Sequence, residues 1–194
     1  MRDIHKVLYG MYFGKRNLYL GCGMDKAESV IRQEWVNLDY FPKVKPDVCH
    51  DINKLPLPFD DGTFNCIFSC HTMEHVRREN FPYIMADIHR ILAPKGWFVV
   101  ITPHGLSNVA WGISQHHMMF NEMTWGGIDP RTYEKEGSYG HMDTEGLPLK
   151  KWNIARMNLV PFPEFENDPE LEWKSKHLHN IINEIHVVMQ REED

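Results

Sequence analysis

Short apolar segments that end in a small or polar residue recur through the first half of the chain. There are four of them, each given with the residue that follows it: Leu18–Leu20 before Gly21, Trp35–Leu38 before Asp39, Asp47–His50 before Asp51, and Cys66–Cys70 before His71. Apolar runs of this length between helical or loop segments are typical of buried parallel strands. The pattern predicts a parallel α/β sheet with polar groups gathered at the carboxyl ends of its strands.

The second half continues the alternation of helices and strands. Apolar residues at helical spacing predict a helix from Phe81 to Leu92, which Pro94-Lys95-Gly96 ends, and Trp97–Ile101 is the strongest strand signal. We expect two more strands at residues 155–160 and 184–190, a helix over residues 169–182, and a short helix over residues 120–125. The fold class is therefore a doubly wound α/β sheet of about seven strands, mostly parallel with an antiparallel last strand.

Length and charge limit the classes of function. A chain of 194 residues fits one domain, and we expect a single domain over residues 1–194. Residues 1–16 would form an N-terminal cap, and residues 105–151 a loop-rich, substrate-facing lid. The net charge of −6 does not favour nucleic acid as a partner, because phosphate binding needs clustered Lys and Arg.

Neither a membrane-spanning segment nor a secretory signal is present in the sequence, so we expect a cytoplasmic protein. The four cysteines form no C-x-x-C pair. They are expected to be reduced and mostly buried, and no metal site is predicted.

The first two predicted strands end in residues suited to an adenosine-containing ligand. Gly21 and Gly23 leave room for a ligand near the backbone, and the carboxylate of Asp39 can accept hydrogen bonds from two ribose hydroxyls. Lys26 stands where the dinucleotide fingerprint has its third glycine, which argues against NAD. Asp25, Asp39 and Asp51 would repel a pyrophosphate but tolerate the positive sulfonium of S-adenosylmethionine.

The sequence resembles the class I S-adenosylmethionine-dependent methyltransferases, in particular the small type 11 group with a Rossmann-like fold. The resemblance covers residues 17–103. The motifs that carry it are Leu18–Gly23, Asn37–Asp39, Asp51 with Leu55–Asp61, Phe64–Ile67, His71–His75 and Ile88–Gly96.

This resemblance implies S-adenosylmethionine as cofactor and a role for each matched residue. Gly21, Cys22 and Gly23 would line its methionine half, and Asp39, with Tyr40 beside it, would hold the ribose. Asp51 and Ile52 would border the adenine, and Cys70 and His71 would lie beside the sulfonium and the acceptor. The activity expected is transfer of a methyl group to an oxygen or nitrogen atom of a small-molecule or sugar acceptor.

Two other functions remain open. One is a binding scaffold that keeps the cofactor but has lost catalysis. The other is a zinc hydrolase, since His71, Glu74 and His75 fit H-x-x-E-H. Such a zinc site needs a long helix, whereas this motif directly follows a strand, and the simpler interpretation is that Glu74 and His75 begin the helix after that strand.

Histidines supply the candidate acid–base groups, although direct displacement needs no dedicated base. His71, His104 and His116 are the candidates, because a neutral imidazole near the cofactor can take a proton from an acceptor. The apolar residues between Met118 and Trp125 are interpreted as core packing, with the wall of an acceptor pocket as the alternative.

Overall fold

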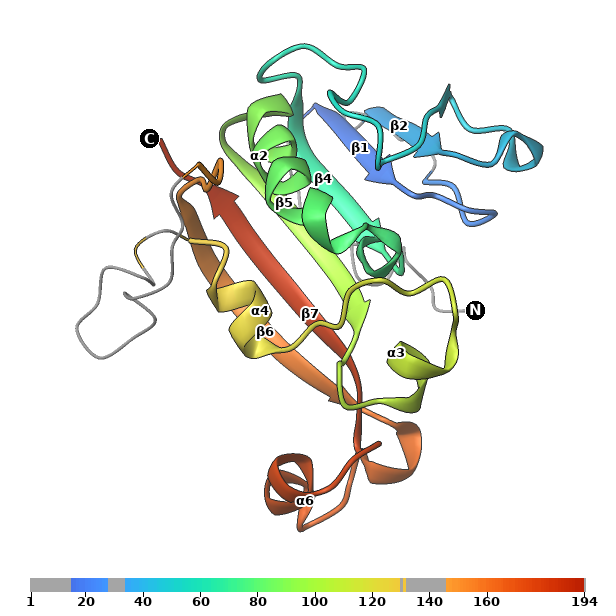
Figure 1. Cartoon of the computed structure of the whole chain (residues 1–194), viewed down its shortest axis with the longest axis vertical. Helices are drawn as coiled ribbons and strands as arrows, with labels where there is room; N and C mark the ends of the chain where they lie inside the picture. The colour runs from blue at the N-terminus through green and yellow to red at the C-terminus, as the bar shows by residue number, and fades with distance from the viewer. Residues whose placement is uncertain (1–14, 28–33, 130, 132–145, 194) are drawn as a thin grey trace.

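The computed structural model describes residues 15–27, 34–129, 131 and 146–193. Seven strands form one sheet in the order β3-β2-β1-β4-β5-β7-β6 (Figure 1). The strands are β1 (Arg16–Leu20), β2 (Glu34–Asp39), β3 (Val48–Cys49), β4 (Phe64–Cys70), β5 (Leu92–Pro103), β6 (Trp152–Pro161) and β7 (Ile182–Arg191).

Strands β1 to β5 are parallel to one another, and β7 runs antiparallel to both β5 and β6. The predicted fold class, a mostly parallel sheet whose last strand is antiparallel, is confirmed. The chain leaves β1 toward β2 and β3, then returns to β4 on the other side of β1. This reversal is the topological switch point where ligands bind in open α/β sheets, at the carboxyl ends of β1 and β4.

Helix α2 (Phe81–Ile91) crosses one face of the sheet over β4 and β5 (Figure 1). Its residues Phe81, Ile84, Met85 and Ile88 are buried at helical spacing and join the larger core cluster. Each such side chain contributes about 1.5–3 kcal/mol when it is buried from water. A second cluster on the opposite face of the strands includes Tyr19, Cys22, Trp35, Cys66 and Phe68. The strands are therefore buried on both faces, as their continuous apolar runs require.

The chain between β4 and α2 does not form the helix start expected at Glu74 and His75. Two 3-10 turns occupy it instead, η2 (Met73–His75) and η3 (Arg78–Asn80), and α2 begins only at Phe81. Strand β5 also begins earlier than predicted, at Leu92, because Leu92 pairs with Phe64 before a bulge brings Trp97 opposite Cys66.

The predicted helix over residues 169–182 is shorter in the structure. Helix α6 (Leu171–His177) ends at His177 and has no buried residue. Asn180 then adopts φ +61° and exchanges hydrogen bonds with Leu106 and Asn108. This turn directs the chain into β7, which a longer helix would prevent.

Only parts of the expected lid are described. They contain helices α3 (Asn108–Gly112) and α4 (Glu122–Gly126), the second close to the predicted helix of residues 120–125. Residue 130 and residues 132–145 of the lid, and residues 1–14 of the expected cap, lie outside the described residues. No helix in the described part of the chain is long and apolar enough to cross a membrane.

Candidate functional site

A cavity of about 490 Å³ lies at the carboxyl ends of β1, β2 and β4, a size typical of small-ligand sites. The rest of its wall is formed by segments 50–53 and 71–75 and by Gln115 and His117, which precede helix α4. The described residues that line it are Gly21, Gly23, Leu38, Asp39, Tyr40, His50, Asp51, Ile52, Asn53, His71, Thr72, His75, Gln115 and His117.

The two glycines after β1 have different reasons to lack a side chain. Both have positive φ, +72° at Gly21 and +55° at Gly23. A Cβ at Gly21 would lie 2.0 Å from the Thr72 hydroxyl oxygen, so this position lets the β1 and β4 loops meet. A Cβ at Gly23 would meet no atom within 4 Å. Gly23 therefore leaves open space at the edge of the cavity, where a ligand can approach the backbone.

Asp39 is held firmly although it lines the cavity. Its Oδ2 accepts from the backbone N–H of Gly23 over 2.9 Å, and its Oδ1 accepts from that of Phe41 over 2.9 Å. A carboxylate has about four acceptor sites, so two such bonds leave capacity for the hydroxyls of a ribose.

Asn53 connects the segment after β3 to the segment after β4. Its backbone N–H donates to Oδ1 of Asp51, and its side-chain amide donates to the carbonyl of His75 over 3.3 Å. The backbone N–H of Arg77 donates to Oδ1 of Asn53 over 2.9 Å. These bonds fix the side of the cavity that Asp51 and Ile52 line.

His71 stands between two buried carboxylates at the end of β4. Its Nε2 lies 3.0 Å from Oε1 of Glu184, and its Nδ1 lies 3.4 Å from Oε1 of Glu74. The second oxygen of Glu184 lies 2.8 Å from Nε2 of His186. The imidazole thus lines the cavity in an orientation set by residues of β7.

The charges around the cavity suit a cationic or neutral ligand better than a phosphate. Asp39 and Asp51 line it, and no lysine or arginine is found among its described lining residues. Phosphate sites normally present such cations or a helix N-terminus.

The structure brings together most of the residues predicted to bind the cofactor. Seven of them line the cavity: Gly21, Gly23, Asp39, Tyr40, Asp51, Ile52 and His71. Cys22 and Cys70 are not among the lining residues, since both pack in or against the second core cluster. Burial raises the pKa of the Cys22 thiol to about 11.

The other two candidate histidines lie outside the cavity lining. His104 is buried, with Nε2 3.3 Å from Oε2 of Glu122 and Nδ1 accepting from the N–H of Leu106. His116 is half-buried, and its ring packs edge to face on His75 at 4.9 Å between centroids. His71 is the candidate that meets the cavity directly.

Several lining residues were not predicted from the sequence, among them Thr72, Asn53, Gln115 and His117. Thr72 carried a signal, since it directly follows His71 at a strand end. The contacts of Gln115 and His117 depend on how the chain after β5 folds back, which no local pattern indicates.

The apolar residues between Met118 and Trp125 pack in the core, and some of them also line a cavity. Met118, Phe120 and Trp125 are buried in the main core cluster. Met118, Met119 and Met123 also line a second cavity of about 410 Å³ against α2. The segment 117–119 thus separates the two cavities.

Comparison with known proteins agrees with this geometry. Residues 18–100 match the family model described as a methyltransferase domain. A search of curated protein sequences found no match.

Solved structures that share the fold include three methyltransferases. A Haemonchus contortus phosphoethanolamine N-methyltransferase 2 in complex with S-adenosyl-L-methionine is 16% identical, with TM-score 0.60 and coverage of 98% of this chain and 51% of that one. An Archaeoglobus fulgidus SAM-dependent methyltransferase is 11% identical, with TM-score 0.58 and coverage of 92% and 86%. A Mesorhizobium loti S-adenosylmethionine-dependent methyltransferase is 17% identical, with TM-score 0.54 and coverage of 92% and 91%. At these identities the likeness supports the fold.

Proposed function

We propose that this chain is a class I S-adenosylmethionine-dependent methyltransferase, which transfers the methyl group of its cofactor to an oxygen or nitrogen atom of a small-molecule or sugar acceptor. The observation that carries the proposal is the position of Asp39, a carboxylate fixed by Gly23 at the rim of a cavity at the switch point of the sheet.

The residues of the cavity fit the cofactor part by part. Asp39 would accept the ribose hydroxyls with its remaining lone pairs, and Tyr40 would cover that side. Gly23 would admit the methionine half, because no atom fills the space where its Cβ would be. Asp51 and Ile52 would border the adenine. The carboxylates of Asp39 and Asp51 would also favour a ligand with positive charge.

S-adenosylmethionine, when bound, supplies a methyl group on a sulfonium that needs no further activation. The protein then has to align the acceptor with that methyl group and exclude water. His71 is the residue we assign to the acceptor side, since its ring lines the cavity and Glu184 holds it in place. With its ring proton on Nε2, toward Glu184, a neutral His71 would keep Nδ1 to accept a hydrogen bond from an acceptor hydroxyl or amine and take its proton.

A small acceptor is supported by the charge of the cavity lining and of the chain. The described lining of the cavity carries no cationic side chain, and the net charge of the chain is −6, neither of which suits nucleic acid. We also propose that the chain is a single domain and is cytoplasmic. Residues 105–151 would face the substrate, and residues 1–16 would form a cap.

A turnover assay separates this proposal from the inactive scaffold. Release of S-adenosylhomocysteine is measured with panels of hydroxyl compounds, amines and sugars, alongside protein and nucleic-acid acceptors. We expect turnover only with members of the small-molecule panels, and a large loss of kcat in His71→Ala. Cofactor binding with no turnover on any panel would favour the scaffold, and turnover on nucleic acid or protein would overturn the acceptor class.

A further inference from the structure

Glu74, His75 and His116 bring three possible metal-ligating atoms within 4.8 Å of one another. Glu74 and His75 belong to the 3-10 turn η2, and His116 comes from the segment between α3 and α4. We propose that these three side chains bind one divalent transition-metal ion of the zinc class. The proposed methyl transfer does not require this ion.

Hydrogen bonds at Nδ1 fix the tautomers of both imidazoles so that each Nε2 can bind a cation. Nδ1 of His75 lies 3.1 Å from the carbonyl oxygen of Gln115, and Nδ1 of His116 lies 3.0 Å from that of Ala110. A carbonyl can only accept, so each Nδ1 carries the proton and each Nε2 keeps a free lone pair. Metal-binding histidines are typically oriented by such a bond from the other ring nitrogen.

The carboxylate of Glu74 has a reason to attract a cation. Glu74 is 1% exposed, and neither of its oxygens has a hydrogen-bond partner among the described residues. The nearest basic group is Nδ1 of His71, 3.4 Å from Oε1. A buried carboxylate without a partner is costly, and a divalent ion between Glu74 and the two imidazoles would remove that cost.

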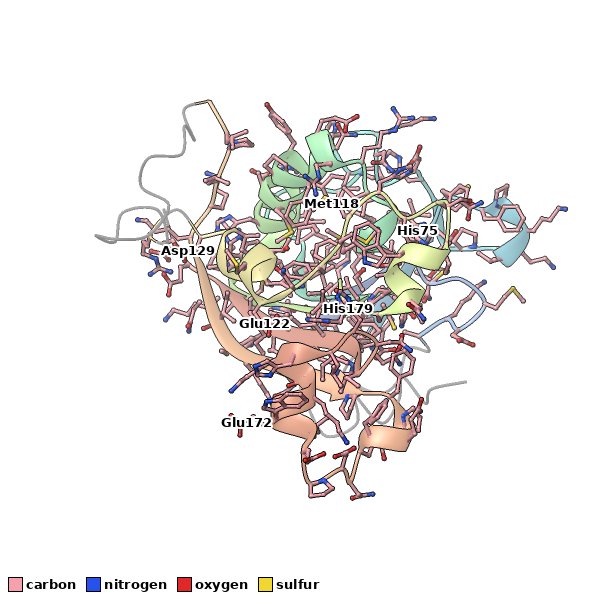
Figure 2. All side chains as sticks on the ribbon, turned by 60° about the horizontal axis from the view of Figure 1, so that its bottom comes forward. His75, Met118, Glu122, Asp129, Glu172 and His179 are labelled. Atoms are coloured by element: carbon pink, nitrogen blue, oxygen red, sulfur yellow. The ribbon has the colours of Figure 1, made fainter. Side chains whose placement is uncertain are left out.

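The three ligands are held together by the backbone, although His116 is distant in sequence. The N–H groups of His117 and Met118 donate to the carbonyl oxygen of Glu74 over 2.7 and 3.2 Å. Figure 2 shows His75 near helix α3, with Met118 on the side toward α4. Small side-chain rotations would therefore place each of the three donor atoms about 2.0–2.2 Å from one shared zinc ion.

Two imidazoles and one carboxylate are a donor set typical of zinc and related divalent ions. Three protein ligands leave one position open for water or another oxygen ligand. His75 lines the cofactor cavity together with Gln115 and His117, so the ion would lie in the cavity wall. An oxygen atom of the acceptor could be the fourth ligand, and this consequence rests on the proposed methyl transfer. The metal site itself does not depend on that proposal.

The proposed site differs from the H-x-x-E-H zinc pattern weighed for the sequence. In that pattern His71 and His75 bind the metal and Glu74 is the base. Here the segment is a short 3-10 turn and both ring nitrogens of His71 face carboxylates. The proposed ligands are instead Glu74, His75 and His116, whereas the sequence alone predicted no metal site.

Calorimetric titration of tag-free, chelator-treated full-length protein with Zn²⁺ tests the site. The variants are His116→Ala and Glu74→Gln, with His179→Ala as the matched control, because it removes an exposed histidine that is neither in the cavity lining nor one of the three proposed ligands. Co²⁺ is titrated in parallel, since tetrahedral coordination gives it strong visible absorption. Binding of S-adenosylhomocysteine is measured on every sample as a check that the cavity is intact.

We expect one ion per wild-type chain, affinity weakened by about tenfold or more in both ligand variants, and no comparable change in His179→Ala. Absence of stoichiometric binding would overturn the site, as would undiminished binding in a ligand variant that still binds S-adenosylhomocysteine. An equal loss in His179→Ala would also overturn it. Metal binding without any cofactor binding would instead contradict only the proposed function.

Discussion

The backbone N–H of Gly23 donates to Oδ2 of Asp39 over 2.9 Å, which joins the loop after β1 to the end of β2. The same carboxylate accepts from Phe41 through Oδ1. Asp39 is therefore positioned before any ligand arrives, and so is the loop whose backbone forms the cavity edge. Preorganisation of this kind reduces the free-energy cost of ordering side chains on binding.

The two glycines beside this bond should respond differently to alanine. Gly21→Ala places a Cβ against Thr72 at positive φ and should lower the free energy of unfolding by about 2–4 kcal/mol. Gly23→Ala has space for its Cβ and should lose only about 1–2 kcal/mol, but it should weaken S-adenosylhomocysteine binding by about tenfold or more. Chemical denaturation and calorimetry measure the two effects.

Thr72→Ala provides the control for the first variant. Combined with Gly21→Ala, it removes the atoms that the new Cβ would meet, so part of the lost stability should return. If Gly21→Ala and Gly23→Ala lose equal stability and equal affinity, the different roles assigned to the two glycines are wrong.

Glu184 should stabilise the fold through the two histidines it contacts. It is 3% exposed, and its oxygens lie 3.0 Å from His71 and 2.8 Å from His186. Glu184→Ala leaves these rings without that acceptor, so we expect a loss of about 1–3 kcal/mol in denaturant unfolding. The exposed Glu170→Ala is the matched control, with a change within about 0.5 kcal/mol. Equal losses in both variants would contradict this account of Glu184.

Asp129 should make stability depend on pH in the acid range. Burial alone would raise the pKa of Asp129, but hydrogen bonds from Arg131 and from the backbone N–H of Trp152 outweigh it and hold this pKa below its usual value. A carboxyl whose folded pKa is depressed stabilises the fold above its unfolded pKa of about 3.9. That stability is lost as pH falls through the folded pKa.

The measurement compares wild type with Asp129→Asn over a range of pH. Wild type should be more stable by about 1–3 kcal/mol at neutral pH, and the difference should shrink as pH falls below about 4. A difference that stays constant down to pH of about 2, below the ordinary carboxyl pKa, would contradict the predicted coupling.

Alkylation in the native state should distinguish the cysteines. Cys66 is fully buried and its pKa is raised well above the usual value, and burial also raises the pKa of Cys22. Cys49 is exposed. Iodoacetamide followed by mass spectrometry should therefore modify Cys49 first and leave Cys22 and Cys66 protected until the protein unfolds. Rapid labelling of Cys66 in folded protein would contradict the sheet packing.

Local patterns predicted the sheet because strands buried on both faces need continuous apolar runs, as in Cys66–Cys70. The carboxyl ends of those strands meet at one edge, so Gly21, Asp39 and His71 could be placed together from the sequence. The length of α6 was overestimated, because the turn at Asn180 depends on bonds to Leu106 and Asn108. Likewise, the segment of Gln115, His116 and His117 is held near the cavity by hydrogen bonds from the N–H groups of His117 and Met118 to the carbonyl oxygen of Glu74, which no periodicity indicates.

The central claim is that the cavity beside Asp39 binds S-adenosylmethionine. Isothermal titration with S-adenosylmethionine and S-adenosylhomocysteine tests it, with NAD as the control ligand and Asp39→Ala and Asp168→Ala as paired variants. Asp168 is a carboxylate shortly before helix α6, outside the cavity lining, and its side-chain partner is Lys174. We predict that wild type and Asp168→Ala bind both S-adenosylmethionine and S-adenosylhomocysteine, and that Asp39→Ala binds neither. No variant should bind NAD. Failure of wild type to bind either ligand, or a preference for NAD, would contradict the claim.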